Sequence, residues 1–585
     1  MAKRAGVKRL ALGASLLALL GLAWAGSGTV RDRATEPGAR TAVRRGGRLV
    51  ATLRSEPKTF NPLLAANDAA REVIQAMTAD LVHVNRQTQL TEPALAEWWR
   101  VSPDGRAYTI GLRKGVLFSD GQPFDADDVV FSFQAYLDPQ LHSPVRDHLI
   151  VGGQPVAVRK VDAHTVRLEL AEPYGAGERI LDSVAMLPEH VLGPAHRAGR
   201  LASAWTLSTP PAELVGLGPF RLKEYEPGER VRLERNPHYW KRDPTGRPLP
   251  YLDELVFLTV PSEDAQVLRF QSGESQLLAR VSADRHDALR SAEGAGRYRL
   301  LDLGAGLEYS ALVFNLNRLG GPSSAEFRRK QSWFRDVRFR RAISLAVDRL
   351  AIARLAYGGR ATPVASHVTP GNRLWMDASL APPAHDPAAA RRLLAEAGFR
   401  PGAGELFDLE GRPVQFSILT SAGNVPRTRM AALIQEDLRA IGIQVRVVPS
   451  EFRAMTERLL RARDYEAALL SLGGGDGDPG SEMNLWLSTG SLHLWGLGQS
   501  GPATPWEAEI DALMQAQMTA TDQAHRRRLY HRVQRLVAEH LPMIFLASPN
   551  VLVGVDVRLT GVRPGILEPQ LLWNVEEIGF AGTGS

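Results

Sequence analysis

Short stretches in which apolar and polar residues alternate dominate the first half of the chain. Residues 48–53, with the sequence RLVATL, show this period of two, which is typical of a half-buried strand. Turn-forming residues separate further stretches of this kind, and we expect strands at 107–112, 156–161, 165–170, 220–225, 231–234 and 255–260. The sequence therefore predicts a mixed, largely antiparallel sheet region before about residue 300.

From about residue 305 the pattern changes, and strands alternate with amphipathic helices. Asp336 is expected to cap one helix, which carries the apolar positions of 343–355 and ends at the glycine pair 358–359. Asp386, followed by a proline at the first helical position, opens another helix that ends at Gly398.

A strand, a helix and a second strand follow one another at 414–419, 428–441 and 443–448. This order is that of a βαβ crossover, which joins parallel strands. The second half is therefore predicted to be an α/β region with a mainly parallel sheet.

The N-terminus has the pattern of a cleavable secretory signal. Four basic residues precede an apolar run at 10–24, and small residues stand at Ala23 and Ala25, the two positions that signal peptidase recognises. The run of about 15 residues is shorter than the roughly 20 needed to span a bilayer. We predict a signal peptide at 1–25, a mobile leader at 26–47 and a periplasmic mature chain. The sequence has no cysteine, so it is not a lipoprotein anchored through that residue.

Charge and size narrow the class of protein. The net charge is +6, but four of the 70 basic side chains precede residue 26, which leaves 66 against 64 acidic ones. A nearly neutral mature chain is not suited to nucleic acid, because such binding requires an excess of basic side chains. A chain of 585 residues is expected to form at least two compact units, because a single core rarely exceeds about 300 residues.

Motifs of common enzyme classes are absent from the sequence. There is no G-x-S-x-G elbow, no H-E-x-x-H pair and no P-loop, and the 14 histidines lack metal-ligand spacing. We therefore expect a protein that is not an enzyme and that holds no cofactor and no metal.

Nine short motifs occur along roughly 500 residues in the order found in one known family. They are PKTFNPL (57–63), LAEWW (95–99), SPDG (102–105), LRKGVLFSDG (112–121), FDADDVVFS (124–132), GPF (218–220), NPHYW (236–240), RFRRAISLAVDR (338–349) and LLAEAGF (393–399). With these motifs the chain resembles the extracellular solute-binding proteins of peptide and nickel ABC transporters.

This resemblance implies an α/β fold, a two-lobe clamshell of the periplasmic-binding-protein type with mixed sheets. The first lobe would be discontinuous, with residues 48–300 and a return segment at 546–585, and the second lobe would comprise 301–545. The hinge would lie at two crossings, near 300–310 and 540–550.

The resemblance also implies a function. A monomer would capture a peptide between its lobes and deliver it to an ABC transporter permease in the inner membrane. Two alternatives remain open at this stage. In the first, a protein of the same fold binds an oligosaccharide, an opine or a metal chelate. In the second, the chain is a secreted enzyme with its active site in the cleft between the lobes.

The loop 473–479, with the sequence GGGDGDP, is the main candidate for ligand binding. It follows an apolar, strand-like stretch, so its carboxylates are expected at a sheet edge. Peptide binders of the resembling family carry here the aspartate that pairs with the ligand's α-ammonium group. Asp476 is the first candidate and Asp478 the second, because the spacing to the proline differs by one residue from that family's. The alternative is a solvated turn.

A second candidate loop contains Thr420, Ser421 and Asn424, between a predicted strand and a helix. Hydroxyl and backbone N–H groups at such a junction can receive a carboxylate. Some dipeptide binders of the resembling family have an arginine near position 421, which this chain lacks. Arg373 or Arg427 could replace it.

Three further side chains complete the candidate site. Glu56 corresponds to an acidic position that faces the ligand in oligopeptide binders of the resembling family. Trp375 and Trp495 could form apolar pockets for ligand side chains, and their alternative role is core packing.

Overall fold

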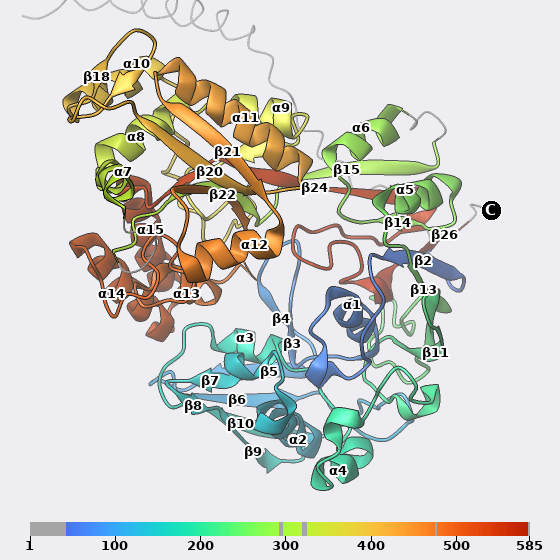
Figure 1. Ribbon diagram of the computed structural model, residues 1–585. Coiled ribbons are helices and arrows are strands. Elements are labelled where there is room, and N and C mark those ends of the chain that lie inside the picture. The colour runs from blue at the N-terminus through green and yellow to red at the C-terminus, as the bar shows by residue number, and fades with distance from the viewer. Residues whose placement is uncertain (1–42, 292–295, 319–323, 474, 476, 583–585) are drawn as a thin grey trace, which may run out of the picture. The chain divides into compact units, whose positions relative to one another are not determined.

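The computed structural model describes residues 43–585 except 292–295, 319–323, 474, 476 and 583–585 (Figure 1). The predicted signal peptide and most of the leader lie outside the described residues. Val43 and Arg44 form β1 (Val43–Arg44), which pairs antiparallel with β26 (Gly579–Ala581). Within the predicted mobile leader 26–47, Val43 and Arg44 thus have a strand partner near the C-terminus.

The strands predicted in the first half are all present. One sheet has the order β5–β6–β10–β9 and is antiparallel throughout, and a second has the order β11–β12–β13–β2 with one parallel pair, β13 and β2. The strands are β2 (Arg48–Leu53), β5 (Ala96–Val101), β6 (Ala107–Leu112), β9 (Ala157–Asp162), β10 (Thr165–Glu169), β11 (Phe220–Glu226), β12 (Arg230–Arg235) and β13 (Glu254–Thr259). The prediction of a mixed, largely antiparallel region is confirmed.

Helices and small hairpins surround these sheets. In α2, Asp125 accepts a hydrogen bond from Asp127 N at 2.8 Å and Asp128 accepts one from Asp125 N at 3.0 Å, a capping box that satisfies free backbone donors. The elements are α1 (Asp68–Met77), α2 (Ala126–Leu137), α3 (Gly177–Asp182), α4 (Glu189–Arg197), α5 (Glu263–Ser272), α6 (Ala283–Ser291), and the paired strands β3 (Val82–Val84) with β4 (Thr91–Pro93) and β7 (Ile150–Val151) with β8 (Gln154–Pro155).

A five-stranded sheet organises the second half, in the order β21–β20–β22–β16–β23. The predicted βαβ unit is confirmed as β20 (Gln415–Ser421), α11 (Val425–Ala440) and β21 (Gln444–Ser450), with the two strands parallel. The sheet as a whole is mixed, however, because β16 (Tyr309–Phe314) runs antiparallel to both β22 (Ala467–Leu472) and β23 (Met543–Phe545). The chain enters and leaves the sheet through β16 and β23 without a βαβ crossover, so the prediction of a mainly parallel sheet is wrong.

Two helices occupy the stretch for which one was predicted. Asp336 caps α8 (Val337–Ala346) as expected, but Val347 has an extended backbone and Asp348 caps α9 (Arg349–Ala356) by accepting from Ala351 N at 2.9 Å. Asp386 caps α10 (Pro387–Glu396) as predicted. The other helices here are α7 (Ala325–Arg335), α12 (Phe452–Thr456), α13 (Met483–Trp486), α14 (Pro505–Thr519) and α15 (Gln523–His540).

Alternate residues of the central strand β16 enter different apolar cores. Leu312 and Phe314 pack with α8 and α11, whereas Ala311 and Val313 pack with α14 and α15. Because side chains of a strand alternate between its faces, the two cores lie on opposite faces of one sheet. We call them the second and third cores.

The first core is built from both ends of the described chain. It contains Leu49, Phe257 and many residues between them, and also Val553 and Ile578. The fold is therefore a mixed α/β architecture in which the C-terminal segment returns to the N-terminal region. Within the described part of the chain, no helix has the length and apolar character needed to span a membrane.

A ribbon of strands connects the cores. Strand β24 (Ala547–Asp556) is antiparallel to β15 (Tyr298–Ala305), and shorter strands β14 (Leu277–Leu278) and β17 (Ala361–Pro363) also pair with it. Ala547 belongs to the second core and Val555 to the first. The register between β15 and β24 shifts between Asp302 and Ala305. The chain thus passes between the cores twice, at the end of β15 and within β24 (Figure 1).

Candidate functional site

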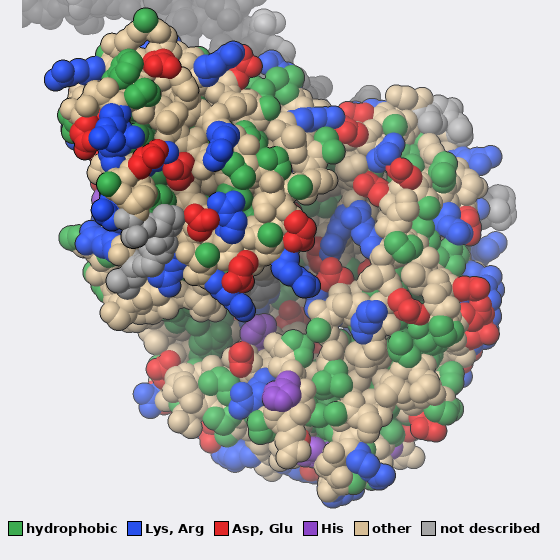
Figure 2. All heavy atoms as spheres, viewed as in Figure 1, with side chains coloured by type: hydrophobic (Ala, Val, Ile, Leu, Met, Phe, Trp, Pro, Cys, Tyr) green, Lys and Arg blue, Asp and Glu red, His purple; other side chains and the backbone are tan. Residues whose placement is uncertain are grey.

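A cavity of about 700 Å³ lies where the segments of the different cores meet. Its wall combines residues near β2 and α3, residues from β24, the C-terminal segment 566–570, and residues of the second half at 306–308 and in the loop after β22. The surface is hollowed between α12 and α1, and basic and acidic side chains gather around the hollow (Figure 2).

Charged side chains of both signs line this cavity. The arginines are Arg54, Arg86, Arg179 and Arg280, and the acidic residues are Asp182, Glu263, Glu308 and Glu568. None of the four arginines belongs to a motif, and they come from four separate segments of the first half. Reasoning from the sequence missed all of them, because no local signal brings them together.

Some of these groups are already paired within the protein. Arg280 forms an ion pair with Glu568 and lies 3.8 Å from Asp68, and its carbonyl oxygen accepts a hydrogen bond from Arg54 Nη2 at 2.8 Å. Glu263 accepts from Ser282 N at 2.7 Å. These contacts give the cavity a fixed wall near residue 280.

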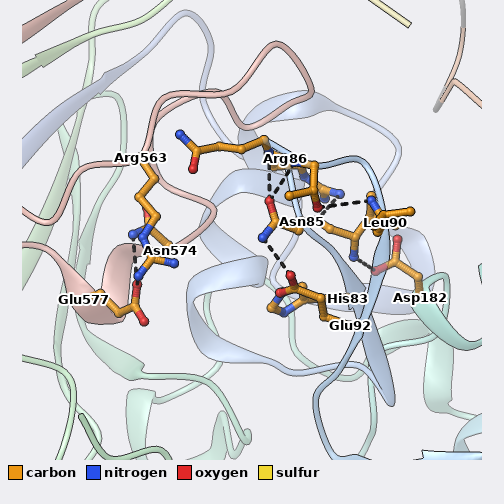
Figure 3. Close-up of polar contacts among 12 residues, drawn as sticks. His83, Asn85, Arg86, Leu90, Glu92, Asp182, Arg563, Asn574 and Glu577 are labelled. Atoms are coloured by element: carbon orange, nitrogen blue, oxygen red, sulfur yellow. Dashed lines mark hydrogen bonds and ion pairs between the residues drawn. The ribbon is translucent and has the colours of Figure 1, made fainter. Parts of the chain in front are cut away.

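Arg86 stands on a tight turn between β3 and β4 (Figure 3). The side chain of Asn85 accepts hydrogen bonds from the backbone N–H groups of the next turn residues, at 2.9 and 3.0 Å, and donates to Glu92 at 2.8 Å. Asp182 of α3 accepts from Val84 N at 3.1 Å, which ties α3 to the base of the turn. The backbone that carries Arg86 is therefore held in place from both sides.

Two partly buried carboxyl groups lie close to charged residues of the same wall. Burial, with the neighbouring carboxylate of Asp182, raises the pKa of Asp80 well above its ordinary value, and the Arg86 guanidinium opposes that rise. Burial likewise raises the pKa of Glu72 to about 7, although Arg280 opposes it. These acids carry less negative charge near neutral pH than their number suggests.

The glycine-rich loop after β22 contributes Gly473 and Gly475 to the cavity wall. Asp476, the first candidate for the ligand's amine, lies outside the described residues, so its prediction stays a prediction. Asp478 turns inward instead. It accepts from Gly480 N at 2.9 Å and forms a bidentate ion pair with Arg526, with N–O distances of 2.8 and 3.1 Å. Both side chains are less than a tenth exposed, which disfavours Asp478 as a ligand contact.

Arg526 connects this loop with the other half of the molecule. Its Nη1 donates to Gly175 O at 2.9 Å, and Gly175 N donates to Met518 O at 2.5 Å. A Cβ atom at position 175 would lie 2.3 Å from Ala520 O, so only glycine allows this approach. A second contact of the same kind joins Gln89 Nε2 to Gly371 O at 2.7 Å.

The second candidate loop does not reach this cavity. Thr420 and Ser421 are buried, and Ser421 Oγ accepts from Arg427 Nη1 at 2.6 Å. Asn424 caps α11 by accepting from Arg427 N at 3.0 Å. Asn424 instead lines a separate cavity of about 550 Å³. The structure thus assigns local structural contacts to these three residues.

The remaining candidates also have partners within the protein. Glu56 accepts from the Tyr225 hydroxyl and from Gly228 N at 2.7 Å, and the Tyr225 contact holds the pKa of Glu56 below its ordinary value. Trp375 and Trp495 are 2% and 1% exposed and belong to the third core. Both tryptophans therefore pack in the core, which is the alternative to a ligand pocket that the sequence left open.

The paired strands between the cores and the charged cavity where the cores meet define a two-lobe substrate-binding protein. Residues 91–492 match the family described as bacterial extracellular solute-binding proteins, family 5. The match covers more than half of the chain, so the protein belongs to this family.

Named relatives agree with this assignment. The chain is 30% identical over 533 residues to a probable ABC transporter-binding protein of Deinococcus radiodurans, covering 87% of this chain and 88% of the relative. It is 30% identical to di/tripeptide-binding protein 2 of Pseudomonas aeruginosa, covering 80% of this chain and 84% of that protein. The structure of the oligopeptide-binding protein AppA of Bacillus subtilis, in complex with a nonapeptide, matches with a TM-score of 0.66 and 25% identity over 92% of this chain and 100% of that one.

Proposed function

We propose that this protein is the substrate-binding component of an ABC importer, which captures a peptide in the 700 Å³ cavity and delivers it to a membrane permease. The observation that carries the proposal is the cavity wall, which combines arginines and acidic residues of the first half of the chain with Glu308 and Glu568 of the second. Family membership and the peptide-binding relatives support it.

Size and charge of the cavity suit such a ligand. Ligand pockets usually measure about 300 to 1,000 Å³, a range that includes this cavity. A peptide carries an ammonium group and at least one carboxylate, and the wall offers both Glu308 and several arginines. Charge-assisted hydrogen bonds to these groups gain strength as water is excluded.

In the proposed mechanism, the lobes close over the ligand. Lobe one is assigned to 48–300 and 546–585, and lobe two to 301–545. Closure would bend the β15 and β24 ribbon and form the contacts of Arg526 with Gly175 and of Gln89 with Gly371. A bound ligand would stabilise the closed state by preferential binding.

The proposed location is the periplasm. The mature chain is expected to begin near Gly26, after removal of the signal peptide. Edman sequencing of the exported form checks this, and an intact Met1 in the membrane fraction would contradict it.

Native mass spectrometry of protein purified without added ligand tests the proposed function. A ladder of bound peptide masses is the expected result. A single bound sugar, opine or metal chelate mass would overturn the peptide proposal in favour of another solute. Calorimetric titration with tripeptide pools and with their N-acetylated forms then measures whether the free amine contributes to binding.

A further inference from the structure

Three of the four arginines in the cavity wall have no carboxylate partner in the described structure. Arg280 is paired with Glu568, but no ion pair of Arg54, Arg86 or Arg179 occurs among the described residues. Arg86 donates from Nη1 to Val84 O at 3.0 Å, and its Nε is buried without a hydrogen-bond acceptor in the described part of the chain. These three guanidinium groups are therefore available to pair with an incoming anion.

Two of these arginines stand on segments that contact one another. Arg179 and Asp182 stand three residues apart on α3 and so share one helix face. Asp182 accepts from Val84 N, two residues before Arg86. The hydrogen bond therefore brings the Arg179 face of α3 against the turn that carries Arg86.

Two acids lie near these segments. Asp182 accepts the Val84 N–H group, and burial raises the pKa of Asp80 well above its ordinary value. Closing a cavity over unpaired guanidinium groups costs desolvation energy unless an anion enters with them. A carboxylate would offset that cost.

We propose that Arg86 and Arg179 form a subsite for a carboxylate, and that the protein prefers peptides with an acidic side chain. Guanidinium groups match carboxylates in a bidentate geometry, one group to one carboxylate. Three unpaired arginines, with Arg54 the third, therefore fit a ligand with more carboxylates than its C-terminal one. This inference rests on the proposed function and adds its substrate class.

The test is calorimetry with the tripeptides Ala-Glu-Ala and Ala-Gln-Ala, which differ in one charge and hardly in shape. We expect the glutamate peptide to bind about thirtyfold more tightly, as for a charged contact formed without water. Arg179→Gln and Arg86→Gln should each reduce this preference to a few-fold. Arg392→Gln changes an exposed arginine on α10, outside the cavity, and should leave the preference unchanged.

Folding and function are controlled separately. Arg86→Lys keeps the positive charge but loses the bidentate geometry of the guanidinium group. This variant should retain part of the preference for the glutamate peptide, and its melting temperature should stay close to that of the unmodified protein. Equal affinities for the two peptides, or a preference that survives both glutamine substitutions, would overturn this inference alone. If no peptide of a mixed pool binds, the proposed function fails and this inference fails with it.

Discussion

Replacing Asp478 by asparagine tests whether this carboxylate binds a ligand or holds the protein together. The substitution removes the negative charge that faces Arg526, in a pair whose side chains are 7% and 4% exposed. Asparagine keeps an oxygen that can accept from Gly480 N, so the cap of the following turn remains. The change therefore removes the charge of the ion pair and keeps this cap.

The expected cost is large because the guanidinium stays buried without its countercharge. Breaking a buried ion pair by removing one partner costs about 3 to 5 kcal/mol. The asparagine oxygen can still accept one hydrogen bond from Arg526, so we expect a loss near the lower limit. An exposed pair would cost less than about 1 kcal/mol.

Urea unfolding of both proteins, followed by circular dichroism, measures the loss. Asp386→Asn is the matched control, because Asp386 caps α10 through Ala389 N but makes no ion pair within the described residues. This substitution should leave the free energy of unfolding almost unchanged, since asparagine caps helices about as well as aspartate. Calorimetry with a peptide and its N-acetylated form completes the assay, and Asp478→Asn should leave the amine preference unchanged. A loss below about 1 kcal/mol together with a lost amine preference would refute this reasoning.

Three further predictions concern pH and closure. The raised pKa of Glu72, about 7, means that the stability of the protein falls as pH rises from about 4.5 towards 7. The melting temperature of Glu72→Gln should therefore fall less between pH 5 and pH 8 than that of the unmodified protein. The lowered pKa of Glu56 stabilises the fold above about pH 4.5 and this stabilisation is lost as pH falls, so Tyr225→Phe should destabilise the protein at pH 7 and have a smaller effect at pH 3 in thermal melts. Gln89→Ala removes the contact with Gly371 O and should weaken peptide binding about fivefold by calorimetry, and an unchanged affinity would show that this contact does not depend on closure.

Local structure was predictable where one residue type has a single physical advantage. Asp386 accepts from a free backbone N–H group at the start of α10, and only short polar side chains do this well. The βαβ unit followed from its apolar periods. The break at Val347 did not, because Asp348 acts as an N-cap inside a stretch whose apolar pattern continues without interruption.

The family, and the discontinuous first core with it, came from motif order along the chain. No motif in the sequence indicated which residues line the cavity. Asp478 looked like a solvated turn residue or a ligand contact, and its partner Arg526 lies 48 positions further along the chain. Likewise the segments that carry Arg86 and Arg179 meet where a strand and a helix distant in the sequence pack together and share a hydrogen bond. Sequence patterns report local periods, whereas these sites depend on pairings between distant segments.

Strand β24 has ten residues, begins in the second core and ends in the first. The stiffness of this strand can change while every side chain that discriminates between ligands stays the same. When only the closed form binds tightly, the apparent affinity scales with the fraction of molecules that close. Substitutions at positions of this strand outside the cavity wall, such as Val553 and Val555, would then multiply every dissociation constant by one common factor. Selectivity would be set by the cavity wall and the working concentration range by the ribbon, so that the importer could adapt to scarce or abundant nutrient without changing which nutrient it takes up.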